Sequence, residues 1–218
     1  MLCTLYAVCS PYAFEVHESL ERLSAEVVAL VANLPPEVAP WPDELGEVIP
    51  PDQLSPRQLE SPVFVPLLTP GHRSRLREEC LEVGFKQFAT IVDPTATLPR
   101  RVQLAEGVHV NAGAVLGSRC SIGGFAIVNR SASVGHDVAI EAYATLGPGC
   151  VVCGSVSVGR GAFVGAGAVI TPERRIGDNA IVGAGAVVVR DVPERSVVVG
   201  NPAGVLRQGG EGYGGVSV

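Results

Sequence analysis

The C-terminal half of the chain repeats with a period of six residues. Every sixth residue from Leu104 to Val188 is Leu, Ile or Val, which makes fifteen such positions in succession. If one residue in three belonged to that class, such a run would arise by chance in about one of ten million registers. Four residues after the aliphatic comes Ala, Cys or Val in fourteen of the fifteen hexads, and Arg174 is the exception. The repeat therefore decides the fold of this half.

A period of six is typical of a triangular parallel β-solenoid, in which three short strands and three corners complete one coil. The residue after the aliphatic is Gly or Asn in ten of the fifteen hexads. We interpret this position as a corner that needs a positive φ. Fifteen hexads predict five coils, and at roughly 4.8 Å per coil the prism would be about 24 Å tall. In this register Cys120 and Cys150 occupy the small inward position and are expected to be packing residues.

Residues 1–92 lack this repeat, and their pattern predicts a different architecture. Apolar runs predict strands, and apolar residues at helical spacing predict two helices, the second ended by Gly84. The predicted elements are a strand over 2–8, a helix starting at 10–11, a strand over 26–31, an irregular connection over 33–62, a strand over 63–68, a helix over 72–83 and a strand over 88–92. This order predicts a small α/β, Rossmann-like domain with a parallel sheet.

We therefore expect three parts. Residues 1–92 form the α/β domain, residues 93–206 form the solenoid, and residues 207–218 form a flexible glycine-rich tail.

Composition and charge exclude several classes of protein. The chain has 16 Lys and Arg against 22 Asp and Glu, a formal charge of −6, which disfavours a nucleic-acid partner and a basic membrane-binding patch. No apolar run is long enough to span a bilayer, and no basic segment precedes the short apolar stretch at the N-terminus. The six cysteines show no disulfide framework. We expect a cytoplasmic protein with reduced thiols.

The solenoid contains two histidines, His109 and His136. They are 27 residues apart, or one and a half coils, so they do not stack on one edge, and we expect no metal site. His136 follows an inward Val and a corner Gly, so it should project outward near an edge, with Asp137 directly after it. Such a pair is either an inert, solvated turn or a general base whose ring is oriented by a carboxylate.

A resemblance to a known family favours the general base over the inert turn, and several motifs carry this resemblance. The segment 127–154, IVNRSASVGHDVAIEAYATLGPGCVVCG, resembles the sugar O-acyltransferase family, which includes sialic acid O-acetyltransferases and N-acetyltransferases of nucleotide-linked 4-amino sugars. The likeness extends to Asp93-Pro-Thr-Ala96 at the solenoid entry, Gly200-Asn-Pro-Ala203 at its exit and Gly71-His-Arg-Ser-Arg-Leu-Arg77 in the second helix.

The resemblance implies a homotrimer of left-handed parallel β-helices with active sites between neighbouring prisms. It implies acetyl-CoA as the donor, held largely by backbone groups, and a sugar or nucleotide sugar as the acceptor of the acetyl or short acyl group. Four roles are carried over from the family. His136 is the general base, Asp137 supports it, Asn129 lies near the acceptor, and coenzyme A lies along Gly154, Ala166 and Ala184.

Three features depart from the family pattern. The loop Val8-Cys-Ser-Pro-Tyr-Ala13 replaces a glycine-rich turn that admits a pyrophosphate, and Val31-Ala-Asn-Leu-Pro35 lacks an acidic residue for a ribose hydroxyl. Thr145 stands where relatives often have a second histidine near the thioester, and we expect its hydroxyl to donate a hydrogen bond there. The alternative function is therefore a non-catalytic, scaffolding solenoid that has lost acceptor recognition.

Arg174 leaves two interpretations open. A local bulge turns its guanidinium outward, or the side chain contacts coenzyme A phosphates or a neighbouring subunit.

Overall fold

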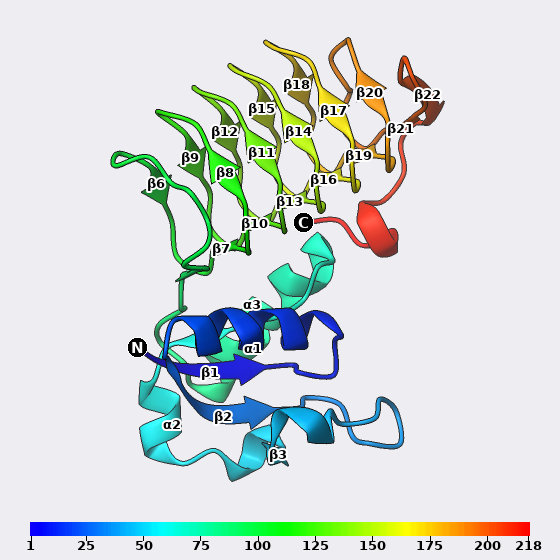
Figure 1. Ribbon diagram of the computed structural model, residues 1–218. Coiled ribbons are helices and arrows are strands. Elements are labelled where there is room, and N and C mark those ends of the chain that lie inside the picture. The colour runs from blue at the N-terminus through cyan, green and yellow to red at the C-terminus, as the bar shows by residue number, and fades with distance from the viewer.

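The computed structural model describes residues 1–218, apart from the side chain of Asp43. It consists of a small α/β domain and a parallel β-solenoid that stands beside it (Figure 1). In the described part of the chain, no helix is both long enough and apolar enough to cross a membrane.

The N-terminal domain is built on a parallel four-stranded sheet of order β3-β2-β1-β4. Its strands are β1 (Leu2–Tyr6), β2 (Glu26–Val31), β3 (Val48–Ile49) and β4 (Val63–Phe64). Its helices are α1 (Tyr12–Arg22), α2 (Pro56–Glu60) and α3 (Pro70–Val83), with 3-10 turns at Asp43–Leu45 and Pro51–Gln53. The predicted α/β domain with a parallel sheet is confirmed.

Two parts of this domain differ from the sequence prediction. The stretch expected to be irregular contains β3 and α2, and α2 begins with a reciprocal capping box between Ser55 and Gln58. The last predicted strand, 88–92, is divided: Phe88 forms a parallel bridge with Val63 of β4, whereas β5 (Ile91–Val92) pairs with β7 (His109–Val110) of the solenoid. The solenoid thus begins at Ile91, slightly before the expected boundary.

The solenoid has three parallel sheets, and each coil adds one strand to each of them. One sheet has the order β20-β17-β14-β11-β8, the second β18-β15-β12-β9-β6, and the third β22-β21-β19-β16-β13-β10-β7-β5. The strands are β6 (Gln103–Leu104), β8 (Val115–Leu116), β9 (Ser121–Ile122), β10 (Ile127–Val128), β11 (Ser133–Val134), β12 (Ala139–Ile140), β13 (Thr145–Leu146), β14 (Val151–Val152), β15 (Ser157–Val158), β16 (Phe163–Val164), β17 (Val169–Ile170), β18 (Arg175–Ile176), β19 (Ile181–Val182), β20 (Val187–Val188), β21 (Val197–Val199) and the antiparallel β22 (Gly204–Arg207).

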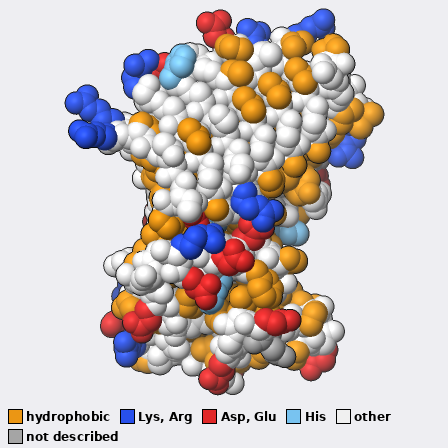
Figure 2. Space-filling view, viewed as in Figure 1, with side chains coloured by type: hydrophobic (Ala, Val, Ile, Leu, Met, Phe, Trp, Pro, Cys, Tyr) orange, Lys and Arg blue, Asp and Glu red, His pale blue; other side chains and the backbone are white. Residues whose placement is uncertain are grey.

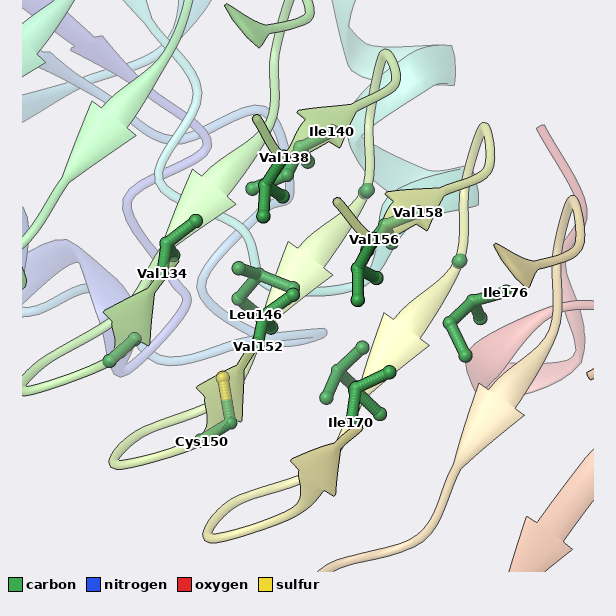
Figure 3. Close-up of a cluster of buried hydrophobic side chains, with 14 of the residues drawn as sticks. Val134, Val138, Ile140, Leu146, Cys150, Val152, Val156, Val158, Ile170 and Ile176 are labelled. Atoms are coloured by element: carbon green, nitrogen blue, oxygen red, sulfur yellow. The ribbon is translucent and has the colours of Figure 1, made fainter. Parts of the chain in front are cut away.

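The interior of the prism is the stack of aliphatic and small residues that the period predicts. Figure 3 shows part of it, with Val134, Val152 and Ile170 of successive coils projecting into the core. Cys120 and Cys150 are buried and unpaired among these side chains, so their predicted packing role is confirmed. Partners lie 18 residues apart, as in Val134 opposite Val152, so each coil is three hexads.

The corners follow a different rule from the one expected. Positive φ values fall three residues after the aliphatic, for example at Arg119 (60°) and Asp137 (59°), and not at the Gly or Asn that follows it directly. In the coils that have glycine there, the next coil passes too close for a side chain. A Cβ at Gly117 would lie 2.6 Å from the carbonyl carbon of Gly135, and one at Gly123 would lie 2.5 Å from the nitrogen of Ala142. The predicted positive φ at this position was therefore wrong.

Three ridges separate the faces of the prism. We call the corner residues 118–119, 136–137, 154–155 and 172–173 the His136 ridge. The corner of 129–131 and its equivalents 148–149, 166–167 and 184–185 form the Asn129 ridge. Residues 124–125, 142–143, 160–161 and 178–179 form the Phe125 ridge. We call the outward side of the sheet of β8, β11, β14, β17 and β20 the Val151 face; it lies between the His136 and Asn129 ridges.

Arg73 joins the two domains. Its side chain, which is fully buried, donates hydrogen bonds to the carbonyls of Phe125 (2.6 Å) and Tyr143 (2.6 Å) on the Phe125 ridge and to the hydroxyl of Thr145 (3.0 Å). Burial lowers the pKa of this guanidinium to about 9. The bonds fix helix α3 against the second and third coils.

A second contact between the domains centres on His109, which is also fully buried. Its Nδ1 lies 2.7 Å from the hydroxyl of Tyr12, and its Nε2 lies 3.3 Å from the hydroxyl of Ser19. The Ser19 hydroxyl donates to Asp93 (2.7 Å), which also pairs with Arg22 (2.8 Å). Helix α1 is thereby held on the first coil.

The tail differs from the flexible extension expected over 207–218. It returns along the Phe125 ridge towards α3 (Figure 1), and the Tyr213 ring stacks on Phe163. Val216 is buried against Gly71, where a Cβ on residue 71 would lie 2.5 Å from Cγ1 of Val216. The N–H of Val218 donates to Oδ1 of Asn179 (2.8 Å). The tail therefore has a defined place between the two domains.

Arg174 lies outside the core, as one of the two interpretations expected. Its Nε donates to the Pro172 carbonyl (3.0 Å), and its Nη1 is 4.0 Å from Asp191. Strands β15 and β18 keep their register beside it, so the predicted bulge is absent from this ladder.

Candidate functional site

His136 and Asp137 form a hydrogen-bonded pair on their ridge. Nδ1 of His136 lies 2.7 Å from Oδ2 of Asp137, and the imidazole is 63% exposed. The hydrogen bonds from Arg119 and then from His136 lower the pKa of Asp137 to about 2. Asp137 is therefore ionised at neutral pH and can only accept. Nδ1 carries the hydrogen, which leaves Nε2 of the neutral ring free to accept a proton.

Arg119 completes this group from the preceding coil. Its Nε donates to Oδ1 of Asp137 (2.5 Å) and its Nη2 donates to Oδ2 (2.6 Å), so the guanidinium holds both oxygens. Arg119 was not predicted as a site residue. Its position 18 residues before Asp137 is the signal that could have found it, because residues one coil apart stack on one ridge.

The imidazole lies over Gly154 of the following coil. A Cβ at Gly154 would lie 2.7 Å from Nε2 of His136 and 2.8 Å from its Cε1. Real Cβ atoms essentially never approach a neighbour within 3.0 Å, so any other residue at 154 would displace the ring from this position. Gly154 was predicted to line the coenzyme A groove, and in the structure it makes space for the histidine.

Asn129 lies on a different ridge from His136, next to the N-terminal domain. Its Oδ1 accepts from the N–H of Arg130 (2.7 Å) and from Nδ2 of Asn111 (3.0 Å). Asn111 also donates to Glu15 of helix α1 (3.0 Å), and Arg130 forms an ion pair with the same carboxylate. Within one chain, Asn129 is thus part of the contact between α1 and the solenoid, and it is not brought together with His136.

Ala166 and Ala184 are exposed and stack on the Asn129 ridge, two and three coils beyond Arg130. Along this ridge a carbonyl accepts from an N–H of the next coil, as when the Gly185 N–H donates to the Ala166 carbonyl (2.9 Å). The N–H groups of Ala166 and Ala184 have no acceptor among the described residues. A row of small residues with free N–H donors fits an extended chain that carries amide carbonyls, such as the pantetheine arm.

Thr145 is placed where it does not reach His136. It lies on β13, on the face covered by the N-terminal domain, and is 1% exposed. Its hydroxyl donates to the Leu68 carbonyl (2.9 Å) and accepts from Arg73 (3.0 Å). Within the chain this geometry gives Thr145 a role in joining the domains, in place of the predicted bond near the thioester, because its one hydroxyl hydrogen is already used.

The N-terminal domain has a pocket at the carboxyl ends of β1 and β2, which is where open α/β sheets bind ligands. It has a volume of about 350 Å³, and its polar lining includes Ser10, Asn33, His72 and Arg75. Tyr12, which stands in the loop where relatives have glycines, does not block it. That side chain is buried and points to His109.

Among the described residues, no three His, Cys, Asp or Glu side chains come together as possible metal ligands.

Comparison with known proteins places these features in a family. The family profile described as bacterial transferase hexapeptide (six repeats) matches residues 131–172 and 155–190. A variant of perosamine N-acetyltransferase from Caulobacter crescentus, solved in complex with CoA and GDP-perosamine, is 31% identical. The match covers 95% of this chain and 97% of that one, with a TM-score of 0.79.

Two further structures are similar along their length. The acetyltransferase domain of PglB from Neisseria gonorrhoeae, in complex with acetyl coenzyme A, is 26% identical over 94% of this chain and 98% of that one, with a TM-score of 0.79. WeeI from Acinetobacter baumannii, at 23% identity over 94% and 100% of the two chains with a TM-score of 0.79, shares the fold. No curated protein sequence gives a significant match.

Proposed function

Since the chain belongs to the hexapeptide-repeat sugar acetyltransferases of the left-handed β-helix type, we propose that His136 is the general base of its acetyl transfer and that the acceptor is a nucleotide-linked sugar. The protein is an acyl-CoA-dependent acetyltransferase with acetyl-CoA as the donor. The similarity to CoA-dependent sugar acetyltransferases and the His136–Asp137 pair favour this function over the scaffolding alternative.

The geometry of the His136–Asp137 pair carries this proposal. Nδ1 of the ring lies 2.7 Å from the ionised Asp137 and donates to it, so in the neutral tautomer the lone pair is on Nε2, on an exposed ridge. Nε2 takes the proton from an acceptor amine or hydroxyl as that group forms its bond to the acetyl carbonyl carbon. The carbon–sulfur bond then breaks, and the proton passes from the imidazolium to the thiolate of coenzyme A, so that atoms and charge balance.

We propose that the site is shared between subunits of a homotrimer. The outward residues of the Val151 face are mostly apolar, and Val115 and Val151 are 47% and 37% exposed. Figure 2 shows apolar side chains scattered over this face and charged ones at its borders. A threefold arrangement about the Val151 face would place the His136 ridge of one subunit beside the Asn129 ridge of the next. It would bring His136 to Asn129, Ala166 and Ala184, which one chain keeps apart.

The acceptor would bind in the pocket of the N-terminal domain. The C. crescentus enzyme was solved with GDP-perosamine, which supports a nucleotide sugar here. Because Glu15 and Asn111 hold α1 against the Asn129 ridge, the pocket of one subunit would face the His136 of its neighbour. His72 and Arg75 in the pocket lining supply polar and cationic groups suited to an anionic acceptor.

The test replaces the base. His136→Ala should lower kcat for acetyl transfer by about 10²- to 10⁴-fold, measured as release of the coenzyme A thiol with a panel of nucleotide-linked amino and hydroxy sugars. The oligomer should be unchanged in light scattering, because the imidazole is exposed and makes no core contact.

Near wild-type turnover in His136→Ala would overturn the assignment of the base. A matched control is His72→Ala, which removes an exposed histidine of the acceptor pocket and should raise KM for the acceptor rather than lower kcat. If free amino sugars were acetylated as well as their nucleotide-linked forms, the nucleotide-sugar acceptor would be wrong while the base could still stand.

A further inference from the structure

Arg119 is bound to the proposed base through a shared carboxylate oxygen. Oδ2 of Asp137 accepts from Nη2 of Arg119 at 2.6 Å and faces Nδ1 of His136 at 2.7 Å, while Oδ1 accepts from Nε of Arg119 at 2.5 Å. Arg119 and Asp137 occupy the same corner position of successive coils, with φ values of 60° and 59°. Through Nε and Nη2 the guanidinium meets the carboxylate edge-on, in the fork geometry that binds both oxygens.

We infer that Arg119 is a positioning residue for His136, acting through Asp137 in two separable ways. This inference rests on the proposed role of His136 as base. First, the fork fixes the plane of the Asp137 carboxylate, and through it the plane of the imidazole. Second, the guanidinium charge offsets the carboxylate charge, so that the pair stabilises the imidazolium less than a lone aspartate would.

Orientation needs such a device because this ridge is open to water. Within one chain the Asp137 side chain is 34% exposed and the His136 side chain 63%, so the packing of the ring over Gly154 does not by itself fix either side chain. A lone aspartate on this ridge could rotate into solvent and leave the ring free to turn. A two-bond fork restricts that rotation, whereas a single bond to an ammonium would not.

The charge effect matters because a base must be neutral before it can accept a proton. A lone carboxylate against Nδ1 favours the imidazolium, which is inactive as a base, and a neighbouring cation opposes that. Other titratable groups near the ring are few. Asp137 lies on its own turn, Arg119 on the preceding coil, and Cys153 precedes Gly154 on the following coil. Glu173 lies one coil further along the ridge.

Two substitutions separate these effects. Arg119→Met removes the fork and the charge, and Arg119→Lys keeps the charge but not the fork. For Arg119→Met we expect kcat on the pH plateau to fall about tenfold and the acid limb of kcat/KM to move to higher pH, over a range of about pH 5.5 to 9. For Arg119→Lys we expect the same fall with the acid limb unmoved. KM for acetyl-CoA should stay within about twofold in both.

A double variant tests whether Arg119 acts through Asp137. In an Asp137→Asn background the fork has no carboxylate to hold, so adding Arg119→Met should lower the plateau no further. Equal falls in both backgrounds would overturn the inference, as would an Arg119→Met profile that superimposes on the wild type. The matched control is Arg195→Met, because Arg195 also occupies a left-handed corner (φ 51°) but lies away from the His136 ridge. It should leave the pH profile unchanged.

The Arg119 side chain is 71% exposed, so its variants should fold, and thermal unfolding and light scattering verify this. His136→Ala separates the two claims. If it retains turnover, the proposed base falls and the role of Arg119 with it. If it loses turnover while Arg119→Met behaves as wild type, only the role of Arg119 falls.

Discussion

Two residues hold the imidazole of His136 by opposite means. Asp137 attracts it with a carboxylate, and Gly154 admits it by having no side chain. The ring therefore lies along the ridge, over the backbone of the next coil, instead of projecting freely into solvent. This arrangement points Nε2 towards the groove in which the thioester is proposed to lie.

Substitution at Gly154 tests this packing. Gly154→Ala places a Cβ 2.7 Å from Nε2, so the ring must move, and we expect kcat to fall about tenfold or more while KM for the acceptor changes little. The measurement is steady-state kinetics together with the melting temperature. Gly124→Ala is the matched control, because Gly124 occupies the same corner position and its nearest neighbour would be 3.5 Å away. Equal kinetics in the two variants would contradict the packing argument.

The sequence predicted the His136–Asp137 pair on this ridge but only part of the geometry around it. His136 and Asp137 are adjacent, so their pairing could be expected from the chain alone. Arg119 and Gly154 reach the same group from other coils, and their roles depend on the 18-residue register and on side-chain directions. The place of Thr145 could not be predicted, because its hydroxyl accepts from Arg73, which is 72 residues away in the sequence.

At the level of elements, helix α1 is fixed to the first coil through a buried and uncharged histidine. Burial lowers the pKa of His109 to about 3, so the ring stays neutral in the folded protein. The pKa of Asp93, at the other end of the same hydrogen-bonded group, is also lowered, but by a different cause. Burial alone would raise its pKa, but hydrogen bonds from Thr95, Ser19 and Arg22 lower it to about 2. The two groups therefore respond to acid in different pH windows.

Acid should weaken this contact in a defined range. Below about pH 6.5 the unfolded chain protonates His109 whereas the folded chain does not until about pH 3, so stability falls as the pH drops between these values. The slope is at most about 1.4 kcal/mol per pH unit. Urea unfolding at fixed protein concentration, compared between the wild type and His109→Gln, measures it. The loss due to Asp93 begins only below about pH 4. Parallel curves for the two proteins above pH 4 would contradict the assignment to His109.

The elements that the sequence predicted best are those with many repeats of one pattern. The hexads specify strands β6 to β20 because each inward residue packs on its equivalents in adjacent coils. The stretch 33–62 was harder, because β3 and α2 are short and rest on local capping and on pairing with β2. The place of the tail depends on contacts of Tyr213 and Val216 with distant parts of the chain, which its glycine content does not reveal.

For the whole molecule, the three sides of the prism have three different surroundings. One side is covered by the N-terminal domain and the tail. A second carries the outward residues of β6, β9, β12, β15 and β18, and these are mostly polar or small. The Val151 face is the remaining side, and its exposed valines need a partner of similar character. A second and third copy of the chain would supply one.

A charge on the Val151 face should prevent assembly. Val151→Lys would bury an unpaired ammonium in the proposed contact. We therefore expect light scattering to give the mass of a single subunit, and activity to fall by about tenfold or more. Ser157→Lys, on the polar side, is the matched control and should remain assembled and active. A Val151→Lys protein that keeps the wild-type mass would exclude this face as the contact.

The left-handed corners separate what the backbone needs from what the side chain does. At these positions the chain requires a particular turn but accepts Arg, Phe, Ser, Asp, Tyr, Glu and Asn alike. Along each ridge, the corner residues of successive coils therefore lie roughly one strand spacing, about 4.8 Å, apart. Their side chains can be exchanged without disturbing the interior. Selection or design can therefore change the functional groups on such a ridge one corner residue at a time.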